Sequence, residues 1–147
     1  MASPFPGYAV IITNHTTQRQ GAEEDETNLE YVFVTKFGFH LLNGPHNLHN
    51  LRRNLTLNQW KCGGDCENQC IQCLIKASQD AKGREYFLFA VSAHGRTGNK
   101  GLEIQFDGGT VLLQDVVDFL NGPDCMKGKQ VIMIIEACRS TDETKGQ

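Results

Sequence analysis

Three uninterrupted apolar runs constrain the fold of this chain more than any other feature. They cover residues 8–13 (YAVIIT), 86–92 (YFLFAVS) and 130–136 (QVIMIIE). None of them alternates between apolar and polar side chains, so each is typical of a strand that is buried on both faces of a sheet. A shorter strand is predicted at residues 38–42. We therefore expect a central sheet with covering layers on both sides.

Helical patterns lie between these runs. Apolar side chains recur at helical spacing within residues 29–37, and the acidic run 23–26 suits the start of such a helix because of the helix macrodipole. A second apolar stripe covers residues 113–120 and is closed by Asn-Gly-Pro at 121–123, which is a strong stop signal. A third helix is expected within residues 47–77, where a glycine pair interrupts it.

Residues 101–111 are predicted to form a β-hairpin, because an Asp-Gly-Gly turn at 107–109 lies between two short extended pieces. Strands that alternate with helices are typical of an α/β fold with a mostly parallel sheet flanked by helices. Such sheets place their functional residues beyond the carboxyl ends of the strands. At 147 residues, the chain is expected to form one domain.

Charge and composition argue against several classes of partner. The net charge of −3 gives no electrostatic reason to expect a nucleic acid or an anionic membrane. The apolar run 8–12 is too short for a signal peptide or a membrane span. A cytoplasmic, reducing location is therefore expected, in which the six cysteines are thiols rather than a disulfide framework.

Two of the apolar runs lead into candidate catalytic residues. Residues 86–92 precede His94, and residues 130–136 precede Cys138. Neighbouring parallel strands would bring the two to one edge of the sheet. A cysteine attacks as its thiolate, and an adjacent imidazole can accept the thiol proton and later protonate a leaving amine. The N–H groups of Gly95 and Cys138 are candidate donors to an oxyanion, the alternative for Gly95 being a flexible turn.

Four motifs, in order along the chain, resemble the caspase family. Residues 136–140 (EACRS) are similar to the caspase signature Gln-Ala-Cys-Arg-Gly, and residues 92–95 (SAHG) resemble the caspase Ser-His-Gly loop. Residues 107–125 with Gly-Lys at 128–129 match the family's hairpin, helix and lead-in strand. Residues 18–25 (QRQGAEED) resemble its Arg-x-Gly-x-x-x-Asp segment. The histidine precedes the cysteine by 44 residues (138 − 94), close to the roughly 50 of that family.

This resemblance implies a caspase-like catalytic domain at residues 7–140, with residues 141–147 as an inter-subunit linker. The implied fold is a three-layer sandwich whose sheet is completed by a separate small-subunit chain. The resulting heterodimer of large and small subunits is implied to associate with a second copy of itself. The implied activity is cofactor-free hydrolysis of protein substrates after aspartate, in regulated cell death or inflammatory signalling. Asp142 is then a candidate processing site, the alternative being a solvated tail.

The resemblance also implies roles for individual residues. Cys138 is the implied nucleophile and His94 its acid–base partner, while the backbone carbonyl of Thr17 orients the imidazole. Arg19 is implied to bind the aspartate side chain before the scissile bond. Bidentate binding of a carboxylate is what the guanidinium geometry favours.

Glu136 departs from the family, which has glutamine at this position of the primary specificity pocket. At about 4 Å and an effective dielectric near 20, a carboxylate would repel a substrate aspartate by about 4 kcal/mol. Three outcomes stay open. In the first, Glu136 pairs with Arg19 and weakens the aspartate preference. In the second, it is protonated or turned away and leaves the preference intact. In the third, it makes the enzyme favour basic residues, as in the similar metacaspases and paracaspases. Arg19 argues against the third outcome, and we expect the aspartate preference to be retained.

Ser140, where the family has glycine, is a second departure. Together with Glu136 it supports an alternative function, that of a catalytically impaired pseudo-caspase that regulates active relatives by dimerising with them. The intact pair of Cys138 and His94 favours the peptidase.

Four cysteines lie close together in the sequence, at Cys62, Cys66, Cys70 and Cys73. Their spacing, C-x3-C-x3-C-x2-C, lacks the paired C-x2-C knuckles of common zinc sites. The last three are predicted to share one face of a helix, where cysteines pack as small hydrophobes. We therefore expect packed or incidental thiols and no metal, with zinc as the weaker alternative.

Overall fold

The computed structural model describes residues 6–14, 22–44, 53–64, 70–78, 85–122 and 128–139, and for residues 22–25, 138 and 139 it describes the backbone alone. The strands are β1 (Gly7–Asn14), β2 (His40–Leu41), β3 (Tyr86–Gly98), β4 (Gly101–Phe106), β5 (Gly109–Leu112) and β6 (Gln130–Arg139). The helices are α1 (Ala22–Glu30), followed directly by the π-helix η1 (Tyr31–Lys36), then α2 (Leu57–Trp60), α3 (Ile71–Ala77) and α4 (Leu113–Asn121). Among the helices in these stretches, none is both long and apolar enough to cross a membrane.

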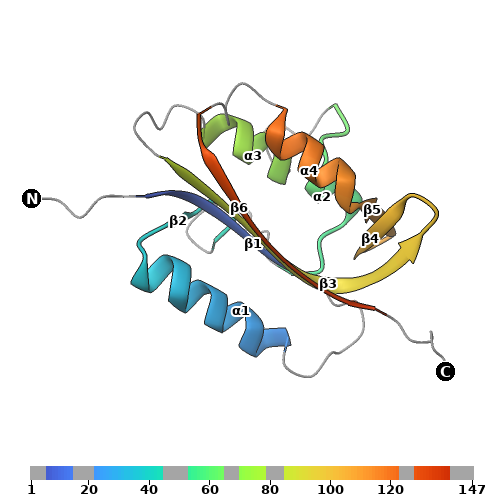
Figure 1. Cartoon of the computed structure of the whole chain (residues 1–147), viewed down its shortest axis with the longest axis horizontal. Helices are drawn as coiled ribbons and strands as arrows, with labels where there is room; N and C mark the ends of the chain where they lie inside the picture. The colour runs from blue at the N-terminus through green and yellow to red at the C-terminus, as the bar shows by residue number, and fades with distance from the viewer. Residues whose placement is uncertain are drawn as a thin grey trace, which may run out of the picture.

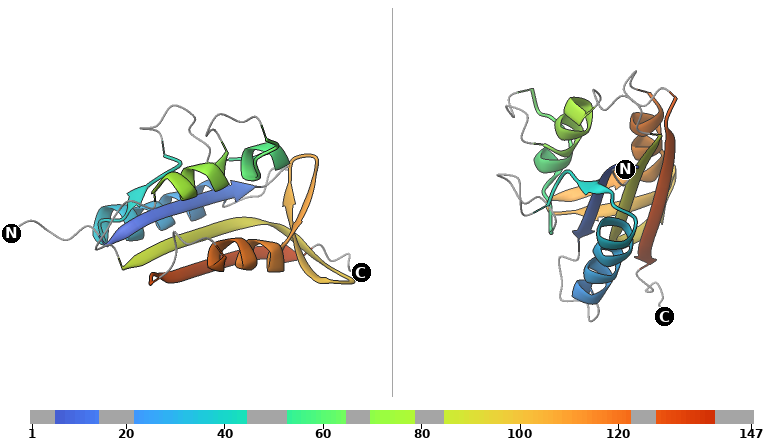
Figure 2. Two further views of the ribbon diagram at one scale, coloured as in Figure 1. Left: turned by 90° about the horizontal axis from the view of Figure 1, so that it is seen from above. Right: turned by 90° about the vertical axis from the view of Figure 1, so that its left-hand side faces the viewer.

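β3 is the central strand of the sheet (Figures 1 and 2). On one side it runs parallel to β1, from Gly7 beside Tyr86 to Asn14 beside Ala93. On its other side it runs parallel to β6, and β2 pairs in parallel with the outer edge of β1. This order, β2-β1-β3-β6, confirms the mostly parallel sheet that the apolar runs predict.

Helices cover both faces of the sheet (Figure 1), with α1 on one face and α2, α3 and α4 on the other. The side chains of β3 alternate accordingly. Phe87 and Phe89 belong to the larger core cluster, which includes residues of α2, α3 and α4. Leu88 instead packs with Ala9 and Phe39 in a second cluster on the opposite face. Burial on both faces is why the runs of β1 and β3 show no apolar–polar alternation.

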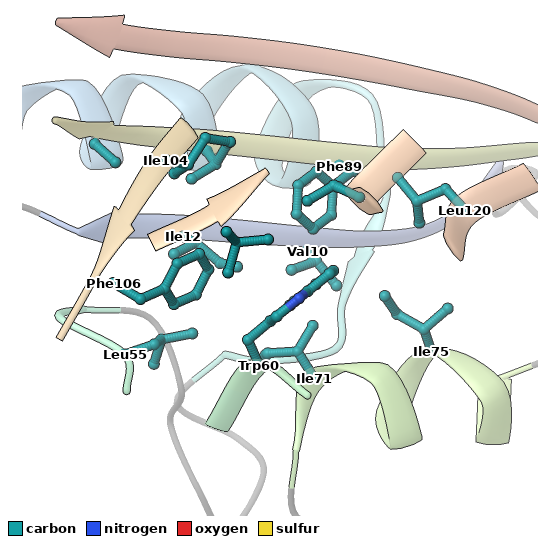
Figure 3. Packing of buried hydrophobic residues seen from close by; sticks show 14 of the residues in the cluster. Val10, Ile12, Leu55, Trp60, Ile71, Ile75, Phe89, Ile104, Phe106 and Leu120 are labelled. Carbon is teal, nitrogen blue, oxygen red and sulfur yellow. The ribbon is translucent and has the colours of Figure 1, made fainter. Parts of the chain in front are cut away.

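Trp60, the last residue of α2, joins several elements within the larger cluster (Figure 3). Its ring centroid lies 5.7 Å from that of Phe89, 6.1 Å from that of Phe106 and 5.9 Å from that of Phe119. These partners come from β3, β4 and α4, so one indole holds a four-residue helix against the sheet and against a neighbouring helix.

Two strands extend beyond their predicted ends. β3 continues to Gly98 and β6 to Arg139, whereas the apolar runs stop at 92 and 136. β3 is prolonged because β4 pairs with it in antiparallel fashion from Gly95 onwards, after the pairing with β1 has stopped. Residues 92–95 are therefore part of a strand rather than the predicted loop, and the hairpin predicted at 101–111 is confirmed as β4 and β5.

The region predicted to hold a third, interrupted helix contains two short helices. α2 begins with a capping box, in which Thr56 Oγ1 accepts from the Gln59 N–H and the Gln59 side chain accepts from the Thr56 N–H. α3 begins only after Cys70, which is extended and caps the helix from outside. The prediction that Cys70 and Cys73 share a helical face with Cys66 is therefore wrong for Cys70; Cys66 lies outside the described residues.

Candidate active site

The sheet places the two candidate catalytic residues side by side. In the parallel register of β3 and β6, His94 is the direct partner of Cys138. Register partners on neighbouring strands lie roughly 4.8 Å apart. His94 is half-buried, and for Cys138 the backbone position alone is described. Residues 44 positions apart in the sequence (138 − 94) are thus brought to adjacent points of one sheet.

His94 also lies where the neighbour of β3 changes. The pairing with β1 ends at Ala93, and the antiparallel pairing with β4 begins at Gly95. Because β6 continues beside β3 through Gly95, both β1 and β4 occupy the same, opposite side of β3. His94 therefore lies at the point where one strand leaves the sheet and another joins it, the kind of place where α/β sheets carry their binding sites.

Gly95 is required by packing at this point rather than by turn flexibility. It is buried within β3. A Cβ atom at this position would lie 2.8 Å from the Cβ of Ala137 on β6 and 3.2 Å from the carbonyl oxygen of Glu103 on β4. The first distance is shorter than real Cβ atoms tolerate, so only glycine fits between the two flanking strands. The flexible-turn alternative for Gly95 is therefore wrong.

Glu136 has a partner on the central strand. Ser92 is its register neighbour, and the fully buried Ser92 hydroxyl donates to Oε1 of the exposed Glu136 at 3.4 Å. Since side chains alternate between faces along a strand, Ser92 and His94 share the face of β3 that also carries Leu88. The Glu136 carboxylate thus lies on the same face of the sheet as the candidate histidine.

Several predicted site residues lie outside the described residues. These are Thr17, Arg19, Ser140 and Asp142. The elements on either side of Thr17 and Arg19 are described, however, because β1 ends at Asn14 and α1 begins at Ala22.

Buried polar residues that the sequence analysis did not single out fix these flanking elements. The fully buried Asn14 accepts at Oδ1 from the Leu55 N–H at 2.8 Å and donates from Nδ2 to the Gln105 carbonyl at 3.4 Å. On α1, the 3% exposed carboxylate of Glu26 accepts from Nε and Nη2 of Arg53 at 2.9 and 2.6 Å. The segment between β1 and α1 therefore begins and ends at anchored points.

The hairpin beyond Gly95 carries an ion pair that predicts a pH dependence. Arg96 and Glu103 are register partners, and Arg96 Nε donates to Glu103 Oε1 at 2.8 Å while the Thr110 hydroxyl donates to the same atom at 3.2 Å. The hydrogen bond from Arg96 lowers the pKa of Glu103 below its usual value, with smaller contributions from the Arg96 charge and Thr110. A lowered carboxyl pKa stabilises the hairpin above the unfolded-state pKa, and this contribution is lost as pH falls through the folded pKa.

We expect Arg96→Gln to raise the pKa of Glu103 toward the ordinary glutamate value, measured from the pH titration of its carboxyl carbon by NMR. The matched control, Thr110→Val, is expected to raise the pKa less, because its hydrogen bond contributes least. A Glu103 pKa that stays low in Arg96→Gln would contradict the assignment of Arg96 as the main cause.

The chain is similar to known proteins over nearly its full length. The family model for the caspase domain (peptidase family C14) matches residues 6–147. No curated protein sequence matches significantly. Among solved structures, caspase-1 from Spodoptera frugiperda is similar at 20% identity and a TM-score of 0.63, covering 91% of this chain and 48% of that one. The Drosophila initiator caspase Dronc is similar at 20% identity and a TM-score of 0.62, covering 88% of this chain and 46% of that one.

The two structural matches show the same fold, and this chain spans about half the length of each matched protein. The family match extends from the start of β1 past the end of β6, so it includes both His94 and Cys138. The predicted caspase-like α/β fold is thereby confirmed, and the chain belongs to the caspase family.

Proposed function

We propose that this chain is the large catalytic subunit of a caspase-type cysteine endopeptidase. The observation that carries this proposal is the register of β3 and β6, which sets His94 directly beside Cys138. Within this proposal, residues 7–140 are the catalytic domain, residues 141–147 are a linker that is processed at Asp142, and the enzyme acts in the cytoplasm in cell death or inflammatory signalling.

The proposed reaction needs no cofactor. The Cys138 thiolate attacks the carbonyl carbon of the scissile peptide bond, and the N–H groups of Gly95 and Cys138 donate to the oxyanion that forms. His94, oriented by the Thr17 carbonyl, protonates the departing amine as the C–N bond breaks. Water then attacks the thioester while His94 accepts its proton, which releases the acid product and regenerates the thiol.

A small-subunit partner is supported by the state of β6. In the described part of the chain, β6 has a strand neighbour on one side only, where it pairs with β3 (Figure 2). The apolar side chains at residues 131–135 of β6 are half-exposed, whereas residues 87–93 of β3 are buried. An apolar strand with an open edge is a site where further strands add. We therefore place the small subunit beside β6, and the resulting heterodimers pair with one another.

We propose that the enzyme cleaves after aspartate, with Arg19 binding the substrate carboxylate. The Ser92 hydroxyl gives Glu136 a partner within the sheet, and an exposed carboxylate is screened by solvent. Both features weaken the repulsion that a substrate aspartate would experience.

Peptides that differ only in the residue before the scissile bond test this specificity. We expect the assembled enzyme to cleave after aspartate in preference to glutamate and arginine. Glu136→Gln is expected to raise kcat/KM for the aspartate substrate by up to about tenfold, because it removes a screened like charge. Ser92→Ala is the matched variant that keeps the charge but removes its hydrogen bond, and it should not raise this kcat/KM. Cleavage after arginine but not aspartate would refute the proposed preference.

A further inference from the structure

Three cysteine sulphurs converge between α2 and α3, whereas their spacing in the sequence predicts thiols without a metal. The Sγ atoms of Cys62, Cys70 and Cys73 all lie within 4.8 Å of one another. Cys62 lies just after α2, Cys70 caps α3, and Cys73 lies within α3. Cys70 is fully buried and the other two are partly buried, and all three are thiols. These three residues are called the cysteine cluster below.

The spacing of the cysteine cluster fits one metal ion. Tetrahedral zinc with Zn–S bonds of about 2.3 Å separates its sulphur ligands by about 3.8 Å. Side-chain adjustments of about 1 Å or less would therefore bring three sulphurs that lie within 4.8 Å onto one ion. A disulfide would require two of them to approach to about 2.05 Å and would leave the third without a role.

Backbone N–H groups already point to two of the sulphurs. The Gly64 N–H donates to Sγ of Cys62 at 3.3 Å, and the Cys73 N–H donates to Sγ of Cys70 at 3.4 Å. Thiolate sulphur is the form of cysteine that binds metals. The contact at Cys70 is the N-cap hydrogen bond of α3, so the cap itself fixes the position of this sulphur.

A surface pocket reaches one cysteine of the cluster. A surface pocket of about 620 Å³ is lined by Cys62 and by Gln72, which lies between the other two cysteines in the chain. The pocket further includes Trp60, whose indole is part of the main core. Of the three cluster cysteines, Cys62 is the one that lines this pocket. This layer covers the face of the sheet opposite to the one that carries His94, so the cluster is separate from the candidate active site.

We propose that Cys62, Cys70 and Cys73 bind one Zn²⁺ ion, which links the end of α2 to the start of α3. Binding displaces the thiol protons, and three thiolates leave the fourth position of the ion to a water molecule or another ligand. The ion links the chain just after Trp60 to the chain just before Ile71. Both residues belong to the core cluster on the same side of the sheet. Because the site exists in the folded protein and not in the unfolded chain, binding of the ion stabilises the fold.

The test measures zinc in the full-length protein carrying Cys138→Ser, so that the candidate nucleophile cannot bind metal itself. After purification without chelator, we expect one zinc per chain by elemental analysis. Cobalt added to the metal-free protein is expected to give the thiolate-to-metal charge-transfer band of a cysteine site. Mutating a residue that only hydrogen-bonds to a metal ligand typically weakens metal affinity by roughly 10- to 100-fold. Cys62→Ser and Cys73→Ser each remove a ligand itself, so each should weaken zinc affinity by more than this.

Cys125→Ser is the matched control, since it removes a thiol outside the cysteine cluster, and it should leave the zinc content unchanged. If a cluster variant fails to fold, the folded Cys138→Ser protein can be titrated with a thiol-blocking reagent instead. This titration should release one equivalent of zinc per chain. Absence of zinc together with absence of the cobalt–thiolate band would overturn the proposal. So would a disulfide between two cluster cysteines in protein purified without reductant, or zinc that is retained in Cys62→Ser and Cys73→Ser.

Discussion

Replacing Cys138 with serine is expected to lower kcat/KM for peptide hydrolysis by roughly 10⁴- to 10⁶-fold in the assembled enzyme, the scale on which loss of a nucleophile acts in proteases. His94→Ala is expected to cost a similar factor, because the two residues are register partners and act as one unit. For the same reason, the double variant should be scarcely slower than either single variant. Hydrolysis of a fluorogenic peptide measures all three.

His40→Ala is the control for the histidine change. His40 is an exposed residue of β2, the strand on the far side of β1 from β3 and β6, and its removal should change kcat/KM by less than about twofold. A substrate-like alkylating inhibitor should label the wild-type enzyme and not Cys138→Ser. Wild-type protein that is assembled but neither labels nor hydrolyses peptides would refute the peptidase and favour the pseudo-caspase regulator.

The strands of the parallel sheet were predictable because their signal is local. Each of β1, β3 and β6 is an apolar run, as strands covered on both faces of a sheet require, although β6 is only partly buried here. Parallel neighbours necessarily bring their carboxyl ends together. The placement of His94 near Cys138 followed from that rule alone. The exact neighbours did not: β3 reaches Gly98 only because β4, formed by later residues, pairs with it. Where the end of a strand is set by a partner strand, the residues at that end do not predict it.

Buried polar residues were likewise not predictable, since they resemble loop residues in the sequence. Asn43 shows the reason. Its Oδ1 accepts from the Ile11 N–H at 3.2 Å and its Nδ2 donates to the Ile11 carbonyl at 2.8 Å, so the fully buried side chain acts as a strand neighbour for β1 where the short β2 has ended. The proximity of Cys62 to Cys70 was not predictable either, because it depends on the path of the chain between two helices.

Trp60→Ala is expected to reduce the free energy of unfolding by about 3–5 kcal/mol, the cost of a large cavity where an aromatic side chain has been removed from a core. The indole is 3% exposed and contacts the rings of Phe89, Phe106 and Phe119. Its loss therefore affects β3, β4 and α4 together, and it releases α2, which is too short to persist without tertiary packing. Chemical denaturation of the full-length protein measures the change.

Phe37→Ala is the matched control, because it truncates an aromatic side chain that is 59% exposed and contacts Phe33 at a centroid distance of 5.8 Å. We expect it to cost less than about 1 kcal/mol, as surface substitutions generally do. Since Trp60 packs against Phe89 on the central strand, its removal should also lower kcat/KM through displacement of β3, while Phe37→Ala should not. Equal stability losses in the two variants would show that the α2 layer is not packed on the sheet as described here. A stability loss confined to Trp60→Ala would support the packing of α2 on β3, β4 and α4 through this indole.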